Sequence, residues 1–360
     1  MGDFDSDIND MRTDKDFRGY SFSKFKKTEV KKELLNSLNQ AKIEPACYWS
    51  CELICAGHYI DLWEIIMLFF SKYIHLSNSK IAIYLEMRIN DFNAIVNNGY
   101  LDNLLRVRNN DKVRKLFCEI MCVLCDAKRR HSFDTIKINK DEMNLLNIKD
   151  QFKAPNMEYG EEIFTIEDPK ELFPFINELA YNVSKEGNNQ MLACYWIEWI
   201  FEYEYRCKLK NEKIVSGRRS FASVDHKYQK QITWVIWDIF LTESKKRSKI
   251  IQKIVDALLF LFCFKYTVSC HKKRKNLLYY AISILCENVV LEKEIISHSQ
   301  TNIVNNVKQK IDLIYKQIKK NEESTDTDYL FLGMKSANLE STIKKLETMN
   351  SFGETFIPRI

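Results

Sequence analysis

Apolar side chains recur along much of the chain at intervals of three and four residues, the period of an amphipathic α-helix. Four series show this spacing: Tyr48, Cys51, Cys55, Tyr59, Leu62 and Ile66; Tyr195, Trp199 and Tyr203; Trp234, Trp237 and Leu241; Ile303, Val307, Ile311, Ile314 and Ile318. Lysines and other polar residues lie between members of the last series, which predicts one long amphipathic helix. The pattern as a whole predicts an all-α protein.

Turn-forming residues are scarce, which favours long helices. The 360 residues include only nine glycines and five prolines, too few for an open β architecture. Asp91-Phe92 and Asn110-Asp111 predict helix starts, and Asn98-Gly99 predicts a helix stop. The most apolar stretches, residues 254–264 and 277–286, have about half the roughly 20 residues that a membrane span needs. We therefore expect buried helices and no transmembrane segment.

Two parts of the chain share a short sequence. Residues 46–49 and residues 193–196 both read Ala-Cys-Tyr-Trp, and residues 62–65 (LWEI) resemble residues 236–239 (IWDI) in the same order. A third shared part, matched by pattern alone, pairs residues 112–125 with residues 249–264. These matches predict two diverged copies of one multi-helix unit, packed as a duplicated helical bundle.

The predicted organisation follows from this duplication and from changes in composition. It comprises an acidic N-terminal tail (1–19), a first helical repeat (20–135), a linker (136–169), a second repeat (170–296) with an inserted loop (207–230), an amphipathic helix (297–320) and an extended C-terminal tail (321–360). In the tail, apolar side chains return without a domain to contain them, which is typical of a docking peptide. The predicted partner-binding residues there are Tyr329, Phe331, Phe352, Phe356 and Ile360.

The eleven cysteines suggest metal binding, but their context favours packing. One predicted helix face carries Cys47, Cys51, Cys55 and His58, and another carries Cys118, Cys122 and Cys125. Zinc knuckles use Gly-containing turns, whereas the spacers here are bulky and apolar. We expect reduced thiols that pack as small apolar groups in an intracellular protein without a secretion signal, with a metal or redox site as the alternative.

Catalytic chemistry is not indicated by the sequence. The six histidines occur in unrelated contexts, and no Gly-rich phosphate loop or dinucleotide fingerprint is present. Four acidic residues lie within apolar helical segments: Glu52, Glu64, Glu198 and Asp238. They could serve acid–base chemistry, but hydrogen bonding to tyrosine, tryptophan or arginine is the preferred interpretation. We therefore expect no enzyme, no catalytic residue, no metal and no cofactor.

Basic residues cluster at predicted helix ends, although the net charge of +5 is modest. The candidate nucleic-acid-binding residues are Lys128, Arg129, Arg130, Lys245, Lys246, Arg247, Lys272, Lys273 and Arg274. Cations near helix C-termini are favoured by the helix dipole, so solvated loops are the simpler explanation. Several such loops on one face would instead bind phosphate groups.

The tryptophan-bearing segments resemble a known family. Residues 44–59 (EPACYWSCELICAGHY), 61–66 (DLWEII) and 71–75 (SKYIH) resemble an uncharacterised protein family of the nucleocytoplasmic large DNA viruses, the giant viruses. Residues 192–199 and 231–240 fit the same pattern, so that the resemblance covers about residues 20–300. It brings no known active site. It implies helical, non-enzymatic proteins in the host cytosol, notably capsid-lining components and factors that attend viral DNA.

The leading hypothesis is a structural or assembly protein of a large DNA virus. Such a minor capsid or capsid-lining component would bind neighbouring capsid or assembly subunits through its helical surfaces and termini, in the host cytoplasm and in the virion. The alternative is a nucleic-acid-binding accessory factor for viral replication, transcription or packaging, motivated by the basic clusters.

Overall fold

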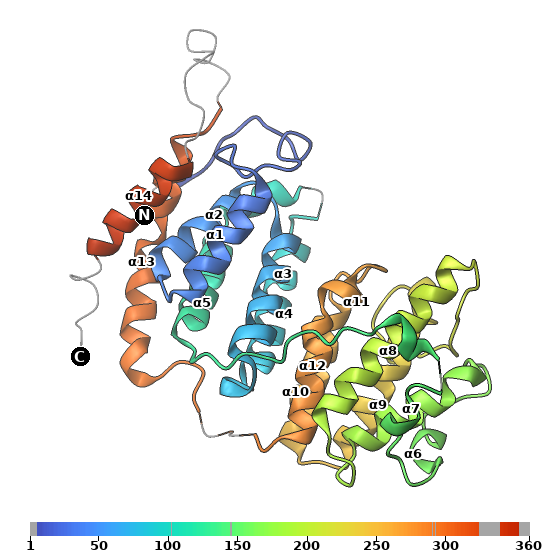
Figure 1. The fold of residues 1–360 in the computed structure, drawn as a ribbon. Helices are drawn as coiled ribbons and strands as arrows, with labels where there is room; N and C mark the ends of the chain where they lie inside the picture. Colours follow the sequence, from blue (N-terminus) through green and yellow to red (C-terminus); the bar gives the residue numbers. More distant parts are fainter. Residues whose placement is uncertain are drawn as a thin grey trace. The chain divides into compact units, whose positions relative to one another are not determined.

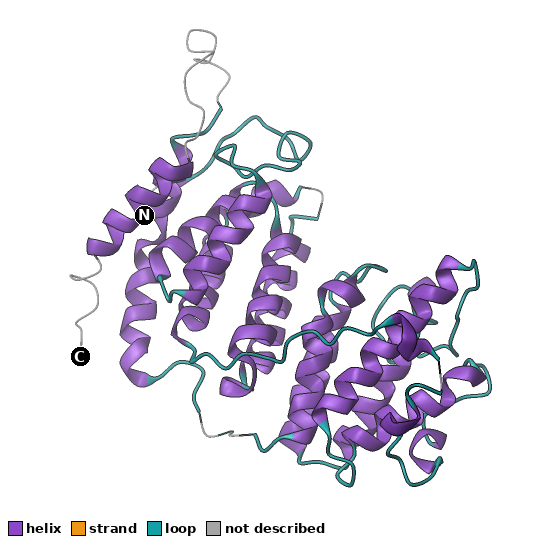
Figure 2. Cartoon of the chain, in the orientation of Figure 1, coloured by secondary structure: helices purple, strands orange, loops and turns teal. Residues whose placement is uncertain are grey.

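Most of the residues that the structure describes lie in helices (Figure 2). The structure, a computed structural model, describes residues 6–101, 103–144, 146–289, 291, 293–323 and 339–352. These residues form no β-strand, only an isolated bridge between Tyr20 and Lys26. The predicted all-α class is confirmed. No helix in the described part of the chain is long and apolar enough to cross a membrane.

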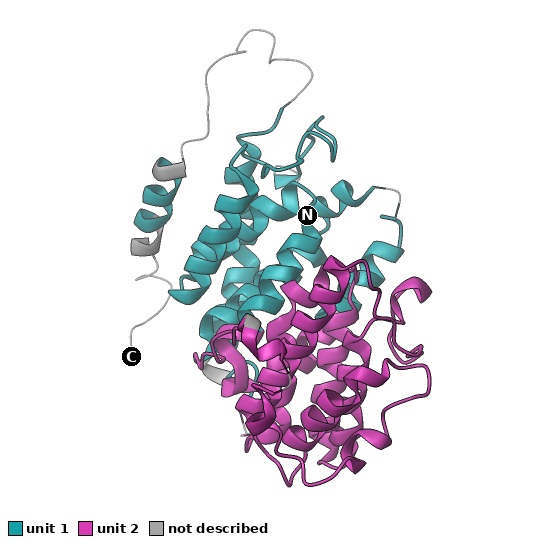
Figure 3. Cartoon of the chain, turned by 45° about the vertical axis from the view of Figure 1, so that its right-hand side comes forward, with its two compact units in different colours: residues 1–70, 87–128, 294–360 teal, residues 71–86, 129–293 magenta. Residues whose placement is uncertain are grey.

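The chain divides into two compact units (Figure 3). Unit 1 comprises residues 1–70, 87–128 and 294–360, and unit 2 comprises residues 71–86 and 129–293. The predicted amphipathic helix is present as α13 (His298–Lys319) and belongs to unit 1, far in sequence from most of that unit. Helix α4 (Ile81–Asn97) begins in unit 2 and ends in unit 1.

Unit 1 is built around one central helix. Its other helices are α1 (Lys27–Asn39), α3 (Tyr59–Phe69), α5 (Asp111–Asp126) and α14 (Leu339–Phe352), with a 3₁₀ turn at Leu104–Asn109. The central helix, α2 (Ile43–Cys55), packs against α1, α3, α5, α13 and α14 (Figure 1). This surrounding explains why every residue from Pro45 to Cys55 is buried.

Unit 2 contains α6 (Glu158–Glu161), α7 (Phe173–Val183), α8 (Gln190–Leu209), α9 (Thr233–Lys245), α10 (Lys249–Cys263), α11 (Cys270–Lys273) and α12 (Lys275–Cys286). A π-helix (Phe70–Ile74) and short 3₁₀ helices (His75–Asn78, Lys140–Met143, Lys149–Gln151, Lys170–Leu172, His226–Tyr228) complete the described elements. Helix α7 packs on α6, α8 and α9, and α12 packs on α8, α9 and α10. The stretches 254–264 and 277–286 fall largely within α10 and α12, as predicted.

The helix boundaries follow ordinary capping chemistry. The Asn110 side chain accepts a hydrogen bond from the Val113 amide at the start of α5, and Gly99 adopts φ +104° after α4, so both of these predictions are confirmed. The predicted start at Asp91-Phe92 is wrong, because both residues lie inside α4. Asp91 instead pairs with Arg88 at 3.0 Å, an (i, i+3) contact within the helix.

The apolar series from Tyr48 to Ile66 is not one helix face. Gly57, at φ +74°, ends α2, and a new helix begins at Tyr59. The amide of Gly57 donates to the Ile54 carbonyl, and the amide of His58 donates to the Leu53 carbonyl. This Schellman motif satisfies carbonyl groups that the helix end would otherwise leave unpaired.

The segments predicted to be a tail, a linker and an inserted loop are partly packed against the helices. Ile8 and Phe17 of the N-terminal segment are buried in unit 1. Ile148 and Ile163, within residues 136–169, are buried in unit 2. Arg219, within the inserted loop, is also buried. The prediction failed here because these segments are polar on average, and only a few of their side chains enter the interior.

The third pair of matched segments is not equivalent in packing. In unit 1, α5 packs on α2, which carries the first Ala-Cys-Tyr-Trp sequence. In unit 2, α12 packs on α8, which carries the second, whereas α10 packs mainly on α9 and α12. The pairing of residues 112–125 with residues 249–264 is therefore wrong, since it was based on pattern without identity. The duplication itself stays a prediction.

Candidate functional site

The two cysteine-bearing helix faces of unit 1 meet. Helix α2, which carries Cys47, packs on α5, which carries Cys118 and Cys122, and all three side chains are buried. All eleven cysteines are free, and all except Cys286 are buried. In the described part of the chain no group of His, Cys, Asp or Glu side chains is arranged to hold a metal ion. Cys47, Cys118 and Cys122 thus lie together in the core of unit 1.

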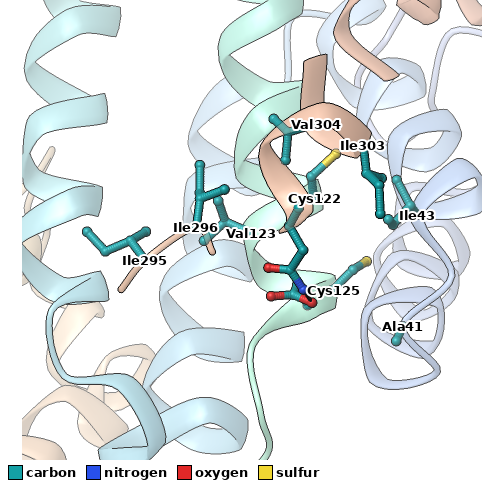
Figure 4. A pocket seen from close by; sticks show the side chains of 11 residues that line it. Ala41, Ile43, Cys122, Val123, Cys125, Ile295, Ile296, Ile303 and Val304 are labelled. Atoms are coloured by element: carbon teal, nitrogen blue, oxygen red, sulfur yellow. Dashed lines mark hydrogen bonds between the residues drawn. The ribbon is translucent and has the colours of Figure 1, made fainter. Parts of the chain in front are cut away.

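A pocket of about 250 Å³ adjoins this cluster. Figure 4 shows Cys122, Val123 and Cys125 of α5 facing it, together with Ile303 and Val304 of α13 and with Ala41 and Ile43 near the start of α2. Its remaining lining residues are Asp126, Ile295, Ile296 and Gln300. The Gln300 amide donates a hydrogen bond to the Asp126 carboxylate. The pocket is mostly apolar, with sulfur on one wall.

The cluster is electrostatically asymmetric. Interactions with the Cys118 and Cys47 thiols lower the pKa of Cys122, burial and the Glu119 carboxylate oppose this shift, and the Lys308 ammonium adds a smaller lowering effect. Interactions with the Cys118 and Cys122 thiols, together with burial, raise the pKa of Cys47. Lys308 itself pairs with Glu119 at 2.6 Å. Of the three residues, only Cys122 lines the pocket.

Three of the four acidic residues singled out in the sequence hydrogen-bond to other parts of their own unit. Glu52 is fully buried and accepts hydrogen bonds from Ser21 Oγ at 2.7 Å, from Ser23 Oγ at 2.5 Å and from the Ser23 amide at 3.0 Å. Burial raises the pKa of Glu52, and these hydrogen bonds oppose the shift. Asp238 pairs with Arg219 at 2.9 Å. These contacts agree with the preferred interpretation of structural satisfaction.

The third of these, Glu198, faces a second pocket, of about 510 Å³, in unit 2. It accepts a hydrogen bond from Tyr279 Oη at 2.6 Å and pairs with Lys275 at 2.9 Å. The other lining residues are Ile136, Lys137, Ile138, Phe201, Glu202, Tyr205, His271, Lys272 and Lys275. Lys272 Nζ lies 5.1 Å from the centre of the Tyr205 ring. This pocket therefore combines aromatic rings with lysines.

The pKa of the histidine in this pocket, His271, is lowered. Burial lowers the pKa of His271, a hydrogen bond with the Val268 carbonyl opposes this, and three neighbouring lysines lower the pKa further. Its ring lies 5.2 Å from the ring of Phe201. The positive charge at the pocket is thus carried by the lysines.

The basic clusters are not single surfaces. Arg247 donates to the carbonyls of Val183 and Leu285, both at 3.3 Å, near the C-terminal ends of α7 and α12. Arg274, only 3% exposed, donates to the carbonyl of Phe262 at 2.6 Å near the end of α10. The guanidinium groups of Arg247 and Arg274 therefore satisfy helix-end carbonyls inside unit 2, and their role in binding nucleic acid stays a prediction.

The remaining basic candidates are exposed or half-buried. Arg129 is half-buried, and Arg130 pairs with Glu287. Lys246 pairs with Glu243 at 2.7 Å. All the candidate lysines are exposed: Lys128 of unit 1 and Lys245, Lys246, Lys272 and Lys273 of unit 2. Among all the candidates, only Lys272 lines the aromatic pocket.

Two buried arginines, Arg114 and Arg219, hold separate segments of the chain together. Neither role was predicted from the sequence. Arg114 of α5 donates to Ser6 Oγ at 2.8 Å and to Asp312 Oδ1 at 2.9 Å, and its guanidinium lies 4.0 Å from the centre of the Tyr315 ring. Arg219 pairs with Asp168 at 2.7 Å. Arg114 could have been noticed, since it shares a helix face with apolar residues three and seven positions later.

Most of the predicted partner-binding residues lie outside the described part of the chain. These are Tyr329, Phe331, Phe356 and Ile360. Phe352 is the last residue of α14, and its side chain is also outside the description. Their role stays a prediction.

Comparison with known proteins gives no relative for this chain. No protein-family model matches it, and neither a curated protein nor a solved structure is significantly similar to it.

Proposed function

We propose that this chain is a non-enzymatic structural or assembly protein that binds neighbouring protein subunits. The proposal rests on one observation: in each unit a buried arginine joins separate segments of the chain. Arg114 connects the N-terminal segment and α13 to α5, and Arg219 connects Asp168 to Asp238 of α9. Networks of this kind hold distant segments in one arrangement and give a scaffold fixed outer surfaces.

The partners follow from the resemblance and from the tail. The tryptophan segments resemble a giant-virus family, so the proposed partners are capsid or capsid-lining subunits in the host cytoplasm and the virion. The C-terminal residues from Tyr329 onward would supply the docking peptide. Within unit 1, α14 packs against α2, and Leu346 is buried. This helix is therefore part of the framework as well as of the tail.

Two truncations test the proposal and separate these roles. Deletion of residues 353–360 removes apolar tail residues but keeps α14, so the protein should melt as the full chain does and lose partner or particle association. Deletion from Tyr329 onward also uncovers α2, so it should reduce the stability of unit 1. Full incorporation of both truncated chains into particles would contradict the proposal.

The second candidate function is nucleic-acid binding, favoured by the aromatic and basic pocket of unit 2. Tyr205 is exposed and lies beside Lys272, a combination that suits stacking on a base next to a phosphate. A Lys272→Glu, Lys273→Glu variant should lose retention on single-stranded DNA at low salt. The control is Lys32→Glu, at an exposed lysine of α1 in unit 1. Absence of any mobility shift for the unmodified chain at low salt would exclude this function.

A further inference from the structure

The pocket of unit 2 is built by several separate parts of the chain. Helix α8 lines it with side chains spaced three and four residues apart, which share one helix face: Glu198, Phe201, Glu202 and Tyr205. The short helix α11 adds His271 and Lys272, α12 adds its first residue, Lys275, and residues 136–138 complete the lining. The volume of about 510 Å³ lies within the range of roughly 300–1,000 Å³ that small-molecule sites occupy.

Aromatic rings supply the flat part of this pocket. The ring of Phe201 lies 5.2 Å from that of His271, whose Nδ1 donates a hydrogen bond to the Val268 carbonyl at 2.8 Å. Tyr205 is 45% exposed, with the Lys272 ammonium 5.1 Å from its ring centre. A half-exposed ring beside a cation suits the stacking of a base that carries a phosphate.

The acidic side chains of the pocket already have partners. Glu198 pairs with Lys275 at 2.9 Å and accepts a hydrogen bond from Tyr279 Oη at 2.6 Å. Glu202 pairs with Arg206 of the same helix at 2.8 Å. These pairs offset the repulsion that the two carboxylates would exert on an anionic ligand.

Two lysines of the pocket remain for such a ligand. Lys137 and Lys272 are exposed, and neither forms an ion pair within the part of the chain that the structure describes. The Glu204 carboxylate, which does not line the pocket, interacts with Lys208 more strongly than with Lys272. The pocket therefore presents two positive charges beside its aromatic rings.

We propose that this pocket binds a nucleoside 5′-monophosphate, with the base stacked on Tyr205 and the phosphate at Lys272 and Lys137. A free nucleotide and the 5′-phosphorylated terminal nucleotide of a strand present the same chemistry. The proposal uses the pocket of the second candidate function, but it does not require that the interior of a strand binds there.

The charge of the pocket favours one terminal phosphate over a longer backbone. Proteins that bind single strands without sequence preference follow several phosphates with a positively charged groove. Here only two lysines of the pocket are unpaired among the described residues, and the neighbouring Lys273 does not line it. A phosphate monoester carries a charge of about −1.5 to −2 at neutral pH, which these two lysines match.

Calorimetric titration of the full-length chain tests the proposal with three probes: adenosine 5′-monophosphate, adenosine and inorganic phosphate. We expect the nucleotide to bind at least about tenfold more tightly than either part alone, because only the nucleotide uses both the ring and the lysines. Tyr205→Ala and Lys272→Ala should each weaken nucleotide binding about tenfold. The matched control, Lys273→Ala, removes an adjacent exposed charge and should change the affinity less than about twofold.

Competition with oligonucleotides identifies the source of the nucleotide. Displacement of adenosine 5′-monophosphate by a 5′-phosphorylated strand, but not by the same strand with a 5′-hydroxyl, would support the proposal with a strand end as the ligand. Displacement by neither strand would support it with the free nucleotide as the ligand. Equal displacement by both strands would overturn it and would favour the second candidate function instead.

Three further results would overturn the proposal. They are no measurable nucleotide binding, equal affinities for the nucleotide and for adenosine, and equal weakening by Lys272→Ala and Lys273→Ala. Loss of strand retention alone would exclude the second candidate function and leave nucleotide binding intact. Thermal melts establish that each variant is folded. Should a variant fail to fold, the comparison of the three probes on the unmodified chain decides the matter.

Discussion

In α2 and α8 the same Ala-Cys-Tyr-Trp sequence places a tyrosine ring edge-on to the neighbouring tryptophan, with 5.1 Å between ring centroids in both helices. Each tryptophan also contacts a phenylalanine from earlier in its unit: Trp49 contacts Phe25 at 5.7 Å, and Trp196 contacts Phe175 at 5.8 Å. The local packing of the tetrapeptide is therefore similar in the two units.

Beyond the tetrapeptide the two helices differ. Helix α2 is covered on several sides and is buried to its last residue, whereas in α8 the only buried residue after Ile200 is Cys207. The additional cover in unit 1 comes from α13 and α14, which follow unit 2 in the sequence. The same short sequence thus forms the centre of one unit and a partly exposed wall of the other.

The largest expected effect on stability comes from removing the tryptophan that the two tetrapeptides share. Trp49→Ala and Trp196→Ala each remove a fully buried indole and should each cost about 3–5 kcal/mol of unfolding free energy. Hydrogen exchange should show the loss of protection mainly in unit 1 for the first variant and in unit 2 for the second. Tyr205→Ala, at an exposed position of α8, is the control and should change stability by less than about 0.5 kcal/mol.

The next effect distinguishes the two buried arginines. Arg219→Ala leaves Asp168, whose side chain is 0% exposed, as an unpaired buried charge and should cost about 3–5 kcal/mol. Arg114→Ala should cost less, about 1–3 kcal/mol, because the Asp7 and Asp312 side chains are 39% and 38% exposed and can be hydrated. Urea denaturation measures the unfolding free energy of both variants. A larger loss for Arg114→Ala would contradict this ranking.

The contributions of Glu52 and Asp168 to the pH dependence of stability should have opposite signs. Burial raises the pKa of Glu52 above 4.5, so its stabilising contribution is complete below pH 4.5 and is lost as the pH rises through the folded-state pKa. Burial acts in the same direction on Asp168, but hydrogen bonds from Arg219, Thr165 and Gly217 outweigh it and lower the pKa below 3.8. Its contribution is present above pH 3.8 and is lost as the pH falls through the folded-state pKa.

Thermal melts across pH test this contrast. Relative to the unmodified chain, Glu52→Gln should gain stability as the pH rises above 4.5, because only the unmodified chain has a carboxylate to ionise there. The deficit of Asp168→Asn should shrink as the pH falls below 3.8. Parallel pH profiles for both variants and the unmodified chain would refute the assignment.

The smallest effect concerns the ends of the same two helices. Both end in a Schellman motif, α2 with Gly57 at φ +74° and α8 with Asn211 at φ +62°. Gly57→Ala should cost about 1–2 kcal/mol, because a Cβ is strained at this φ and would lie 3.0 Å from Leu105 Cδ2. Asn211→Gly should stabilise by less than about 1 kcal/mol, since it removes a milder strain. Calorimetry of the two variants compares them directly.

The helical class, the extent of α13 and the capping of α5 by Asn110 follow from the sequence, because periodicity and caps depend on residues a few positions apart. The basic clusters show the limit of that reasoning. Arg247 and Lys246 are adjacent and carry the same charge. Arg247 donates to helix-end carbonyls, whereas Lys246 forms an ion pair with Glu243 near the surface. The difference depends on which helix ends lie beside each side chain.

The sequence by itself determined that this protein is built from helices and that its tryptophan segments are buried. Tertiary structure alone decided that α13 joins unit 1, that residues near the N-terminus pack around Arg114, and that the thiols of Cys47, Cys118 and Cys122 share one cluster. The physical reason is that hydrophobic periodicity identifies the face a helix buries but not the helix that covers it. That choice depends on side-chain packing between segments far apart in the chain.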